Sequence, residues 1–161
     1  MTQRFAAVVA SVVIIGAAAC GSKPPTPTPS PVAAAPRATP TAAIGKNGAG
    51  QTEIKIYLSE ATGQYQTGSA TITDLGGKTQ VLVNVAPAMA NAQPIHIHIG
   101  TCDAVGTISD KLENVVVGKS VTEIDRPLAE IAAGGKVVNV HLSASEIRTY
   151  TACGEIPALK P

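Results

Sequence analysis

Hydrophobic and polar residues alternate in short runs along the chain after residue 50. In the run 52–58, Ile54, Ile56 and Leu58 alternate with Glu53, Lys55 and Tyr57, which is the pattern of a strand with one buried face. Similar runs follow at 68–73, 79–85, 94–99, 114–117, 120–124 and 136–142, and glycine-containing turns separate several of them. Short strands divided by turns predict an all-β fold, an antiparallel sandwich or flattened barrel of about 7–8 strands.

Helix signals are few. Pro127 opens the run 127–133 and a glycine pair closes it, which predicts about two helical turns. The segment from Ser143 to Glu146 fits a capping box, so a second short helix is expected directly after the last of these strands. The sequence therefore predicts one or two short helices beside the strands.

The N-terminus has the pattern of an export signal. Arg4 is followed by the uncharged stretch 5–16, three alanines and then Cys20. The apolar stretch is shorter than the roughly 20 residues that span a bilayer. A cysteine directly after small residues resembles a bacterial lipobox, although the usual leucine three positions earlier is here Ala17. The resemblance implies a lipoprotein signal peptide at 1–19 and an acylated Cys20 that anchors the chain in the cell envelope, facing the periplasm or the exterior. The alternative is ordinary secretion.

Composition divides the rest of the chain in two. Residues 24–41 contain seven prolines, which predicts an extended spacer, and we assign 20–47 to a flexible tether. Residues 48–161 are long enough for one β domain. All eleven carboxylates lie beyond residue 52, against eight Lys and Arg there, so the domain is mildly acidic. No basic face with interleaved aromatic residues is apparent, and nucleic acid is not an expected partner.

Two cysteines fall within the predicted domain, Cys102 and Cys153. An even number of cysteines in an exported chain predicts a disulfide, and the alternative is two free thiols. A bridge closing about 50 residues would stabilise the fold by roughly 4 kcal/mol in the chain-entropy model.

The three histidines of the chain lie in two apolar strands. His96 and His98 alternate with Ile95, Ile97 and Ile99, so both imidazoles should lie on one face and the isoleucines on the core face. His141 alternates with Val138 and Val140 and should also project from the non-core face. Three imidazoles suit copper, zinc, nickel or iron, and they predict a metal site at His96, His98 and His141. The alternative is three polar residues on a half-solvated sheet.

The order of these residues resembles that in Cu,Zn superoxide dismutases. The segment Ile95-His-Ile-His-Ile-Gly-Thr-Cys102, the strand ending at His141 and the segment around Cys153 match two copper ligands, the first cysteine, a third ligand and the second cysteine. The resemblance covers roughly residues 50–157 and implies a Greek-key β-sandwich, a copper site and a Cys102–Cys153 bridge. The same histidine segments also resemble the CHRD domain, a β module without an established catalytic role.

The chain departs from the dismutases in three places. No histidine lies between Cys102 and His141, so the bridging ligand and the family's zinc site are missing. The long charged loop is reduced to residues 143–152. Tyr150 occupies the position of the arginine that attracts superoxide, and Arg148 is the nearest arginine in the sequence.

Three functions agree with this pattern. The first is a copper-dependent dismutase, or a remnant of one, with weak or absent activity towards superoxide. The second is a non-catalytic copper binder that exchanges copper with a donor or acceptor in the envelope. The third is a structural or interaction module that binds no metal, as the CHRD likeness implies. A hydrolytic zinc site ranks last, because the sequence places no general base beside the histidines.

Overall fold

The alternating runs form strands of an antiparallel sheet in the computed structural model, which describes residues 42–160. The predicted signal peptide, Cys20 and most of the predicted tether lie outside this range. One short helix, α1, accompanies nine strands, and the all-β prediction is confirmed. The elements are β1 Ala43–Lys46, β2 Thr52–Glu60, β3 Thr67–Asp74, β4 Thr79–Ala86, β5 Ile95–Thr101, β6 Ala104–Lys111, β7 Lys119–Ile124, α1 Leu128–Ile131, β8 Lys136–His141 and β9 Tyr150–Ile156.

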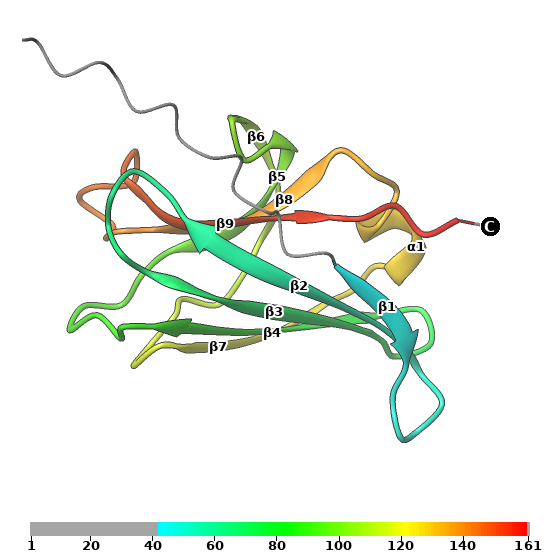
Figure 1. Cartoon of the computed structure of the whole chain (residues 1–161). Coiled ribbons are helices and arrows are strands. Elements are labelled where there is room, and N and C mark those ends of the chain that lie inside the picture. Colours follow the sequence, from blue (N-terminus) through cyan, green and yellow to red (C-terminus); the bar gives the residue numbers. More distant parts are fainter. Residues whose placement is uncertain (1–41, 161) are drawn as a thin grey trace, which may run out of the picture. The chain divides into compact units, whose positions relative to one another are not determined.

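The sheet curls into a half-barrel with two facing layers (Figure 1). Its strand order is β6-β5-β8-β9-β2-β3-β4-β7, and β1 adds to β2 outside this path. The strand β2 joins the layers, because its residues 53–58 pair with β3 whereas Ser59 and Glu60 pair with β9. The strands β5 and β8, distant in sequence, are antiparallel neighbours. This pairing places the histidines of β5 beside the strand that carries His141.

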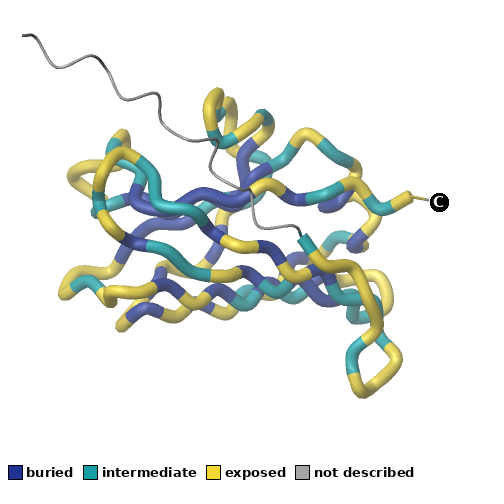
Figure 2. Tube along the Cα trace, in the orientation of Figure 1, coloured by how far each residue is buried: buried dark blue, intermediate teal, exposed yellow. Residues whose placement is uncertain are grey.

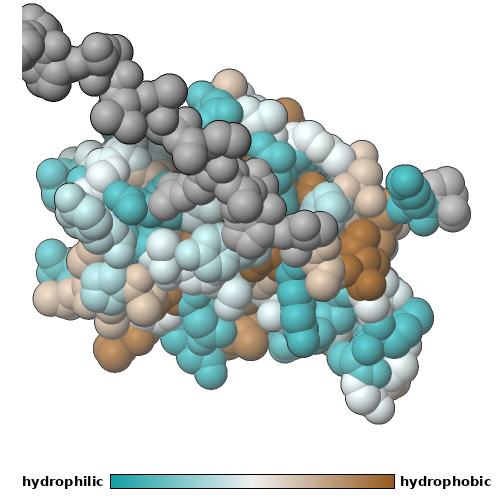
Figure 3. All heavy atoms as spheres, viewed as in Figure 1, coloured by the Kyte–Doolittle hydropathy of each residue, from teal (hydrophilic) through white to brown (hydrophobic). Residues whose placement is uncertain are grey.

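The core lies between the two layers and is aliphatic. Ile54, Ile72 and Val83 line it from one layer, and Ile97 and Val140 line it from the other, all fully buried. Buried and more exposed residues alternate along β2 and β4, as expected for a sheet that buries one face, whereas β8 is buried on both faces (Figure 2). On the outer surface, apolar atoms form small separate patches among polar side chains (Figure 3). Within residues 42–160, no helix has the length and hydrophobicity needed to cross a bilayer.

Six of the seven predicted strands are present, and the prediction of a strand at 114–117 is wrong. Residues 115 and 116 make only isolated bridges to Gln93 and Lys119, after which Val117 and Gly118 form a turn with positive φ. Val115 is buried in the core, but the apolar side chains of Val116 and Val117 are exposed, so most of this run does not line the core.

The two helix predictions have different outcomes. Pro127 precedes α1 and the left-handed Gly134 and Gly135 follow it, as predicted, but the helix spans only the four residues Leu128–Ile131 and is shorter than the two turns expected. The second expected helix is a turn. The capping contact from the Glu146 N–H to Ser143 Oγ is present at 3.1 Å, but the chain turns back into β9 instead of continuing as a helix. The strand β1 also lies within the range 20–47 assigned to the tether, and it pairs with β2.

Candidate metal centre

Three imidazoles meet on the face of β5 and β8 that points away from the core. The strand register pairs β5 with β8, and His141 follows a β-bulge at the end of β8. One ring nitrogen from each of His96, His98 and His141 lies within 4.8 Å of the other two. The ring centroids are 4.9 to 5.6 Å apart. The structure therefore brings together all three residues that the sequence predicts as ligands.

His98 is fixed by a backbone carbonyl of the neighbouring strand. Its Nδ1 lies 2.9 Å from the Gly106 carbonyl oxygen, at a bulged position of β6. Because a carbonyl only accepts hydrogen bonds, Nδ1 carries the proton and Nε2 keeps a free lone pair. That Nε2 atom is buried and has no hydrogen-bond partner in the described part of the chain. A buried imidazole nitrogen with a free lone pair is the arrangement expected of a metal ligand.

His141 is held in the same way. Its Nδ1 donates to the Ile147 carbonyl oxygen in the loop before β9, so Nε2 is the unprotonated nitrogen, and it accepts a hydrogen bond from His96. Its backbone N–H donates to the Pro94 carbonyl oxygen at 2.9 Å. The ring is buried, and the edge of Tyr150 packs against it with ring centroids 5.3 Å apart. His141 therefore presents Nε2 to the cluster in a defined orientation.

His96 is the least buried member and lies closest to solvent. Its Nδ1 is 3.0 Å from His141 Nε2, so in the metal-free protein His96 donates its proton to His141. Burial lowers the pKa of His96 to about 4, and the neighbouring histidines and Lys111 contribute. Burial also lowers the pKa of His141. The rings of His96 and His141 are therefore neutral at physiological pH, as metal binding requires.

The geometry fits a single transition-metal ion. Imidazole nitrogens bind zinc at about 2.0–2.1 Å, so two of them on one ion are at most about 4.2 Å apart. The observed separations reach 4.8 Å, and a small inward movement of the rings closes the site. Binding would replace one hydrogen bond, between His96 and His141. The three buried histidines could hold a metal ion, with His96 Nδ1, His98 Nε2 and His141 Nε2 as the donors.

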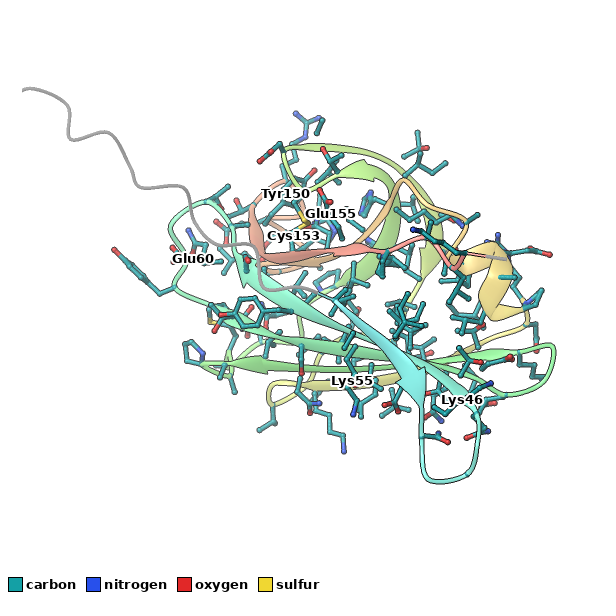
Figure 4. The ribbon with its side chains drawn as sticks, turned by 45° about the vertical axis from the view of Figure 1, so that its right-hand side comes forward. Lys46, Lys55, Glu60, Tyr150, Cys153 and Glu155 are labelled. Atoms are coloured by element: carbon teal, nitrogen blue, oxygen red, sulfur yellow. A yellow bond between two sulfur atoms is a disulfide. The ribbon has the colours of Figure 1, made fainter. Side chains whose placement is uncertain are left out.

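A disulfide lies beside the cluster. Cys102, just after β5, is bonded to Cys153 on β9, with Cα atoms 5.8 Å apart and a sequence separation of 51. Cys153 is opposite Asn139 of β8 in the register, and Tyr150 begins β9 nearby (Figure 4). The bridge closes the side of the site formed by β9, and it indicates an oxidising, extracytoplasmic location.

A pair of buried glutamines supports the end of β8 from the core side. Gln66 and Gln93 exchange two amide hydrogen bonds of 3.0 Å, and Gln66 also donates to the Pro87 carbonyl oxygen. Gln93 Nε2 lies 3.1 Å from the His141 carbonyl oxygen and 3.3 Å from Thr151 Oγ1. These bonds connect the loop after β2 and the segment before β5 to the end of β8 and the start of β9. Sequence reasoning missed the pair, because a lone glutamine carries no strand-pattern signal.

Two expectations about the surroundings of the site need correction. Ile99 was expected in the core, but it is 53 % exposed at the end of β5, where the pairing with β6 is irregular. The alternative of three polar residues on a half-solvated sheet does not hold for His98 and His141, which are nearly fully buried. Arg148 is exposed in the loop that covers His141.

The described residues thus define an all-β half-barrel with a buried three-histidine cluster and a disulfide. No family model, curated protein or solved structure matches the chain. The function is therefore inferred from the sequence, the fold and the histidine cluster alone.

Proposed function

We propose that the protein is a lipid-anchored envelope protein that holds one copper ion through His96, His98 and His141, with weak or absent superoxide dismutase activity. The observation that carries the proposal is the set of backbone carbonyls that orient the imidazoles. The Gly106 and Ile147 carbonyls each accept a hydrogen bond from the Nδ1 of one histidine, which leaves Nε2 of that histidine unprotonated and directed into the cluster. A merely structural histidine cluster does not require two unprotonated nitrogens directed at one point.

Copper is favoured by the dismutase-like order of the three ligands in the sequence. Imidazole nitrogens suit copper, zinc, iron and nickel, whereas magnesium and calcium prefer oxygen donors. Copper, when bound, supplies a one-electron redox couple. Within the chain, His96 is the partly exposed ligand, so an incoming anion would approach from its side.

Features of the same residues limit catalysis. The dismutase-like order lacks the bridging histidine, and Tyr150 lies against His141 at the position of the guiding arginine. The excess of carboxylates beyond residue 52 gives a field that repels an anion. Lys111 is opposite His96 in the register and is a positive charge beside the ligands. One lysine within an acidic domain supports a copper binder with modest turnover better than an enzyme near the diffusion limit.

Metal analysis of the purified protein tests the proposal. We expect one equivalent of copper per chain, and we expect its loss in His96→Ala, His98→Ala and His141→Ala, because two imidazoles bind far more weakly than three. Lys119→Ala, an exposed residue on β7, serves as the control and should retain copper. A parent protein that remains empty after copper exposure would contradict the proposal and favour a structural module.

Superoxide decay followed by stopped flow separates a binder from an enzyme. We expect the copper-loaded protein to react far below the diffusional ceiling of about 10⁸–10⁹ M⁻¹s⁻¹. His141→Ala, treated with copper in the same way, provides the background rate. Decay near the ceiling would make the protein a full dismutase and refute this part of the proposal.

A further inference from the structure

Asn139 lies among the three histidines. It is directly opposite His96 in the β5–β8 pairing and opposite Cys153 in the β8–β9 pairing. Its neighbours Val138 and Val140 belong to the core cluster, so the amide points to the other face, where the imidazoles are. His98 is its diagonal neighbour across the strands, and His141 is two residues further along β8. Asn139 therefore lies on the same face of the sheet as the three histidines and next to them.

The amide of Asn139 is buried without a protein partner. The residue is 0 % exposed, and neither Nδ2 nor Oδ1 makes a hydrogen bond within residues 42–160. Burying an unpaired amide is unfavourable, and native structures contain few such groups. Val137, the preceding residue on the same face, is equally buried and apolar. An apolar side chain would therefore suit this position better if packing were its only role.

The unpaired buried atoms gather at one place. In the described part of the chain, the buried side-chain nitrogen and oxygen atoms without a partner are the two of Asn139 and Nε2 of His98. Both residues belong to the same patch of the β5–β8 face. A shared deficit of polar contacts at the histidine cluster is what a site for a bound ion would show.

We propose that the carboxamide oxygen of Asn139 is a fourth donor to the metal ion at the three-histidine site. This inference rests on the proposed metal-binding function and deepens it. Of the two amide atoms, only Oδ1 has lone pairs available for an ion, so Oδ1 is the donor. Directly opposed residues have Cβ atoms about 4.5–5.5 Å apart, which brings the Asn139 amide within reach of an ion held by His96. The resulting set of three nitrogens and one oxygen matches the four-coordinate sites that zinc and copper accept.

The test compares Asn139→Leu with the parent and with Asn84→Leu, the same substitution at an exposed position of β4. Copper affinity is measured by competition with a chelator, the coordination by electron paramagnetic resonance of Cu(II), and the fold by thermal unfolding of the metal-free proteins. We expect copper binding by Asn139→Leu to be about 10- to 100-fold weaker, with a changed spectrum. We also expect its metal-free form to unfold at or above the parent temperature, because the unpaired amide is gone. Asn84→Leu should match the parent in affinity and spectrum.

A second variant keeps the test decisive if Asn139→Leu does not fold. Asn139→Asp retains an oxygen donor of the same size, and we expect it to bind copper at least as tightly as the parent. Parent-like affinity and spectrum in Asn139→Leu, or loss of binding in folded Asn139→Asp, would overturn the assignment of Asn139 while leaving the three-histidine site intact. Absence of copper binding by the parent would instead refute the metal-binding function itself.

Discussion

Replacing Gln93 by leucine would break the buried amide pair behind His141. The substitution leaves Gln66 Oε1 without its partner and removes the bond to the His141 carbonyl oxygen. A buried acceptor left unpaired costs about 1–3 kcal/mol, and the net loss of a hydrogen bond adds about 1 kcal/mol. Gln93→Leu should therefore lower the free energy of unfolding by about 2–4 kcal/mol. At about 4 °C per kcal/mol for a domain of this size, the melting temperature should fall by roughly 8–16 °C.

The double variant Gln66→Leu/Gln93→Leu separates hydrogen bonding from packing. Removing both members of the pair costs less than the two single losses together, because neither glutamine amide is then left unpaired, although the bonds to the Pro87 and His141 carbonyls are still lost. We expect the double variant to be more stable than the sum of the single losses predicts, with a coupling energy of about 1–3 kcal/mol.

Urea unfolding of the metal-free parent, both single variants and the double variant provides the four free energies of the cycle. Gln64→Leu is the matched control. Gln64 lies in the same loop as Gln66, is only partly buried, and donates one long hydrogen bond of 3.5 Å to the Thr62 carbonyl oxygen. Its effect should stay within about 0.5 kcal/mol. Additive single effects, or a loss in Gln93→Leu no larger than that of the control, would refute the view that the pair supports the end of β8.

Three further predictions concern the disulfide, the pKa of His96 and the lipidation of Cys20. Replacing both Cys102 and Cys153 by alanine should lower the free energy of unfolding by about 4 kcal/mol in urea denaturation, because the bridge no longer restricts the unfolded chain; an unchanged midpoint would contradict this. Since the pKa of His96 falls from 6.5 to about 4 on folding, the unfolded chain binds more protons between these pH values. The metal-free protein should therefore lose stability as the pH falls from 7 to 4, and His96→Gln should show a shallower loss; parallel curves would argue against the shift. If Cys20 carries the lipid, Cys20→Ser should move the protein from the detergent phase to the aqueous phase in a phase-partition experiment.

Strand prediction succeeded where one face of the strand meets the aliphatic core. In β2, Ile54, Ile56 and Leu58 are buried while Lys55 and Tyr57 are exposed, so the pattern in the sequence mirrors the fold. The valines at 115–117 have the same apolar composition, but only Val115 is buried in the core, while Val116 and Val117 are exposed beside a turn. Composition alone therefore does not distinguish a strand from an exposed apolar turn.

The missed strands lack that hydrophobic signal for different reasons. In β6 no residue is buried, because this edge strand pairs only with β5 and contributes no residue to the core. The strand β9 packs through small residues, and Gly154 shows why. A Cβ on Gly154 would lie 2.4 Å from the Tyr57 carbonyl oxygen, so a side chain there would separate β9 from β2. Close backbone approach requires small residues, and small residues give a weak strand pattern.

The sequence predicts the ligands of the candidate site but not how they are oriented. Alternation in β5 and β8 was sufficient to place His96, His98 and His141 on one face. Asn139 has the same parity as His141 on β8, so the same argument could have identified it. The carbonyls of Gly106 and Ile147 are backbone atoms, and no side-chain pattern marks them.

Those two carbonyls determine how the cluster would receive an ion. They fix the tautomers of His98 and His141, so both residues present an unprotonated Nε2 before any ion arrives, free in His98 and hydrogen-bonded to His96 in His141. Only His96 has to change, by giving up its hydrogen bond to His141 and moving its proton from Nδ1 to Nε2. His96 is also the ligand nearest to solvent, so the residue that must rearrange is the one that an incoming ion meets first. The buried histidines are preorganised and the outer one is adjustable, which suits a site that takes up its ion after the domain has folded.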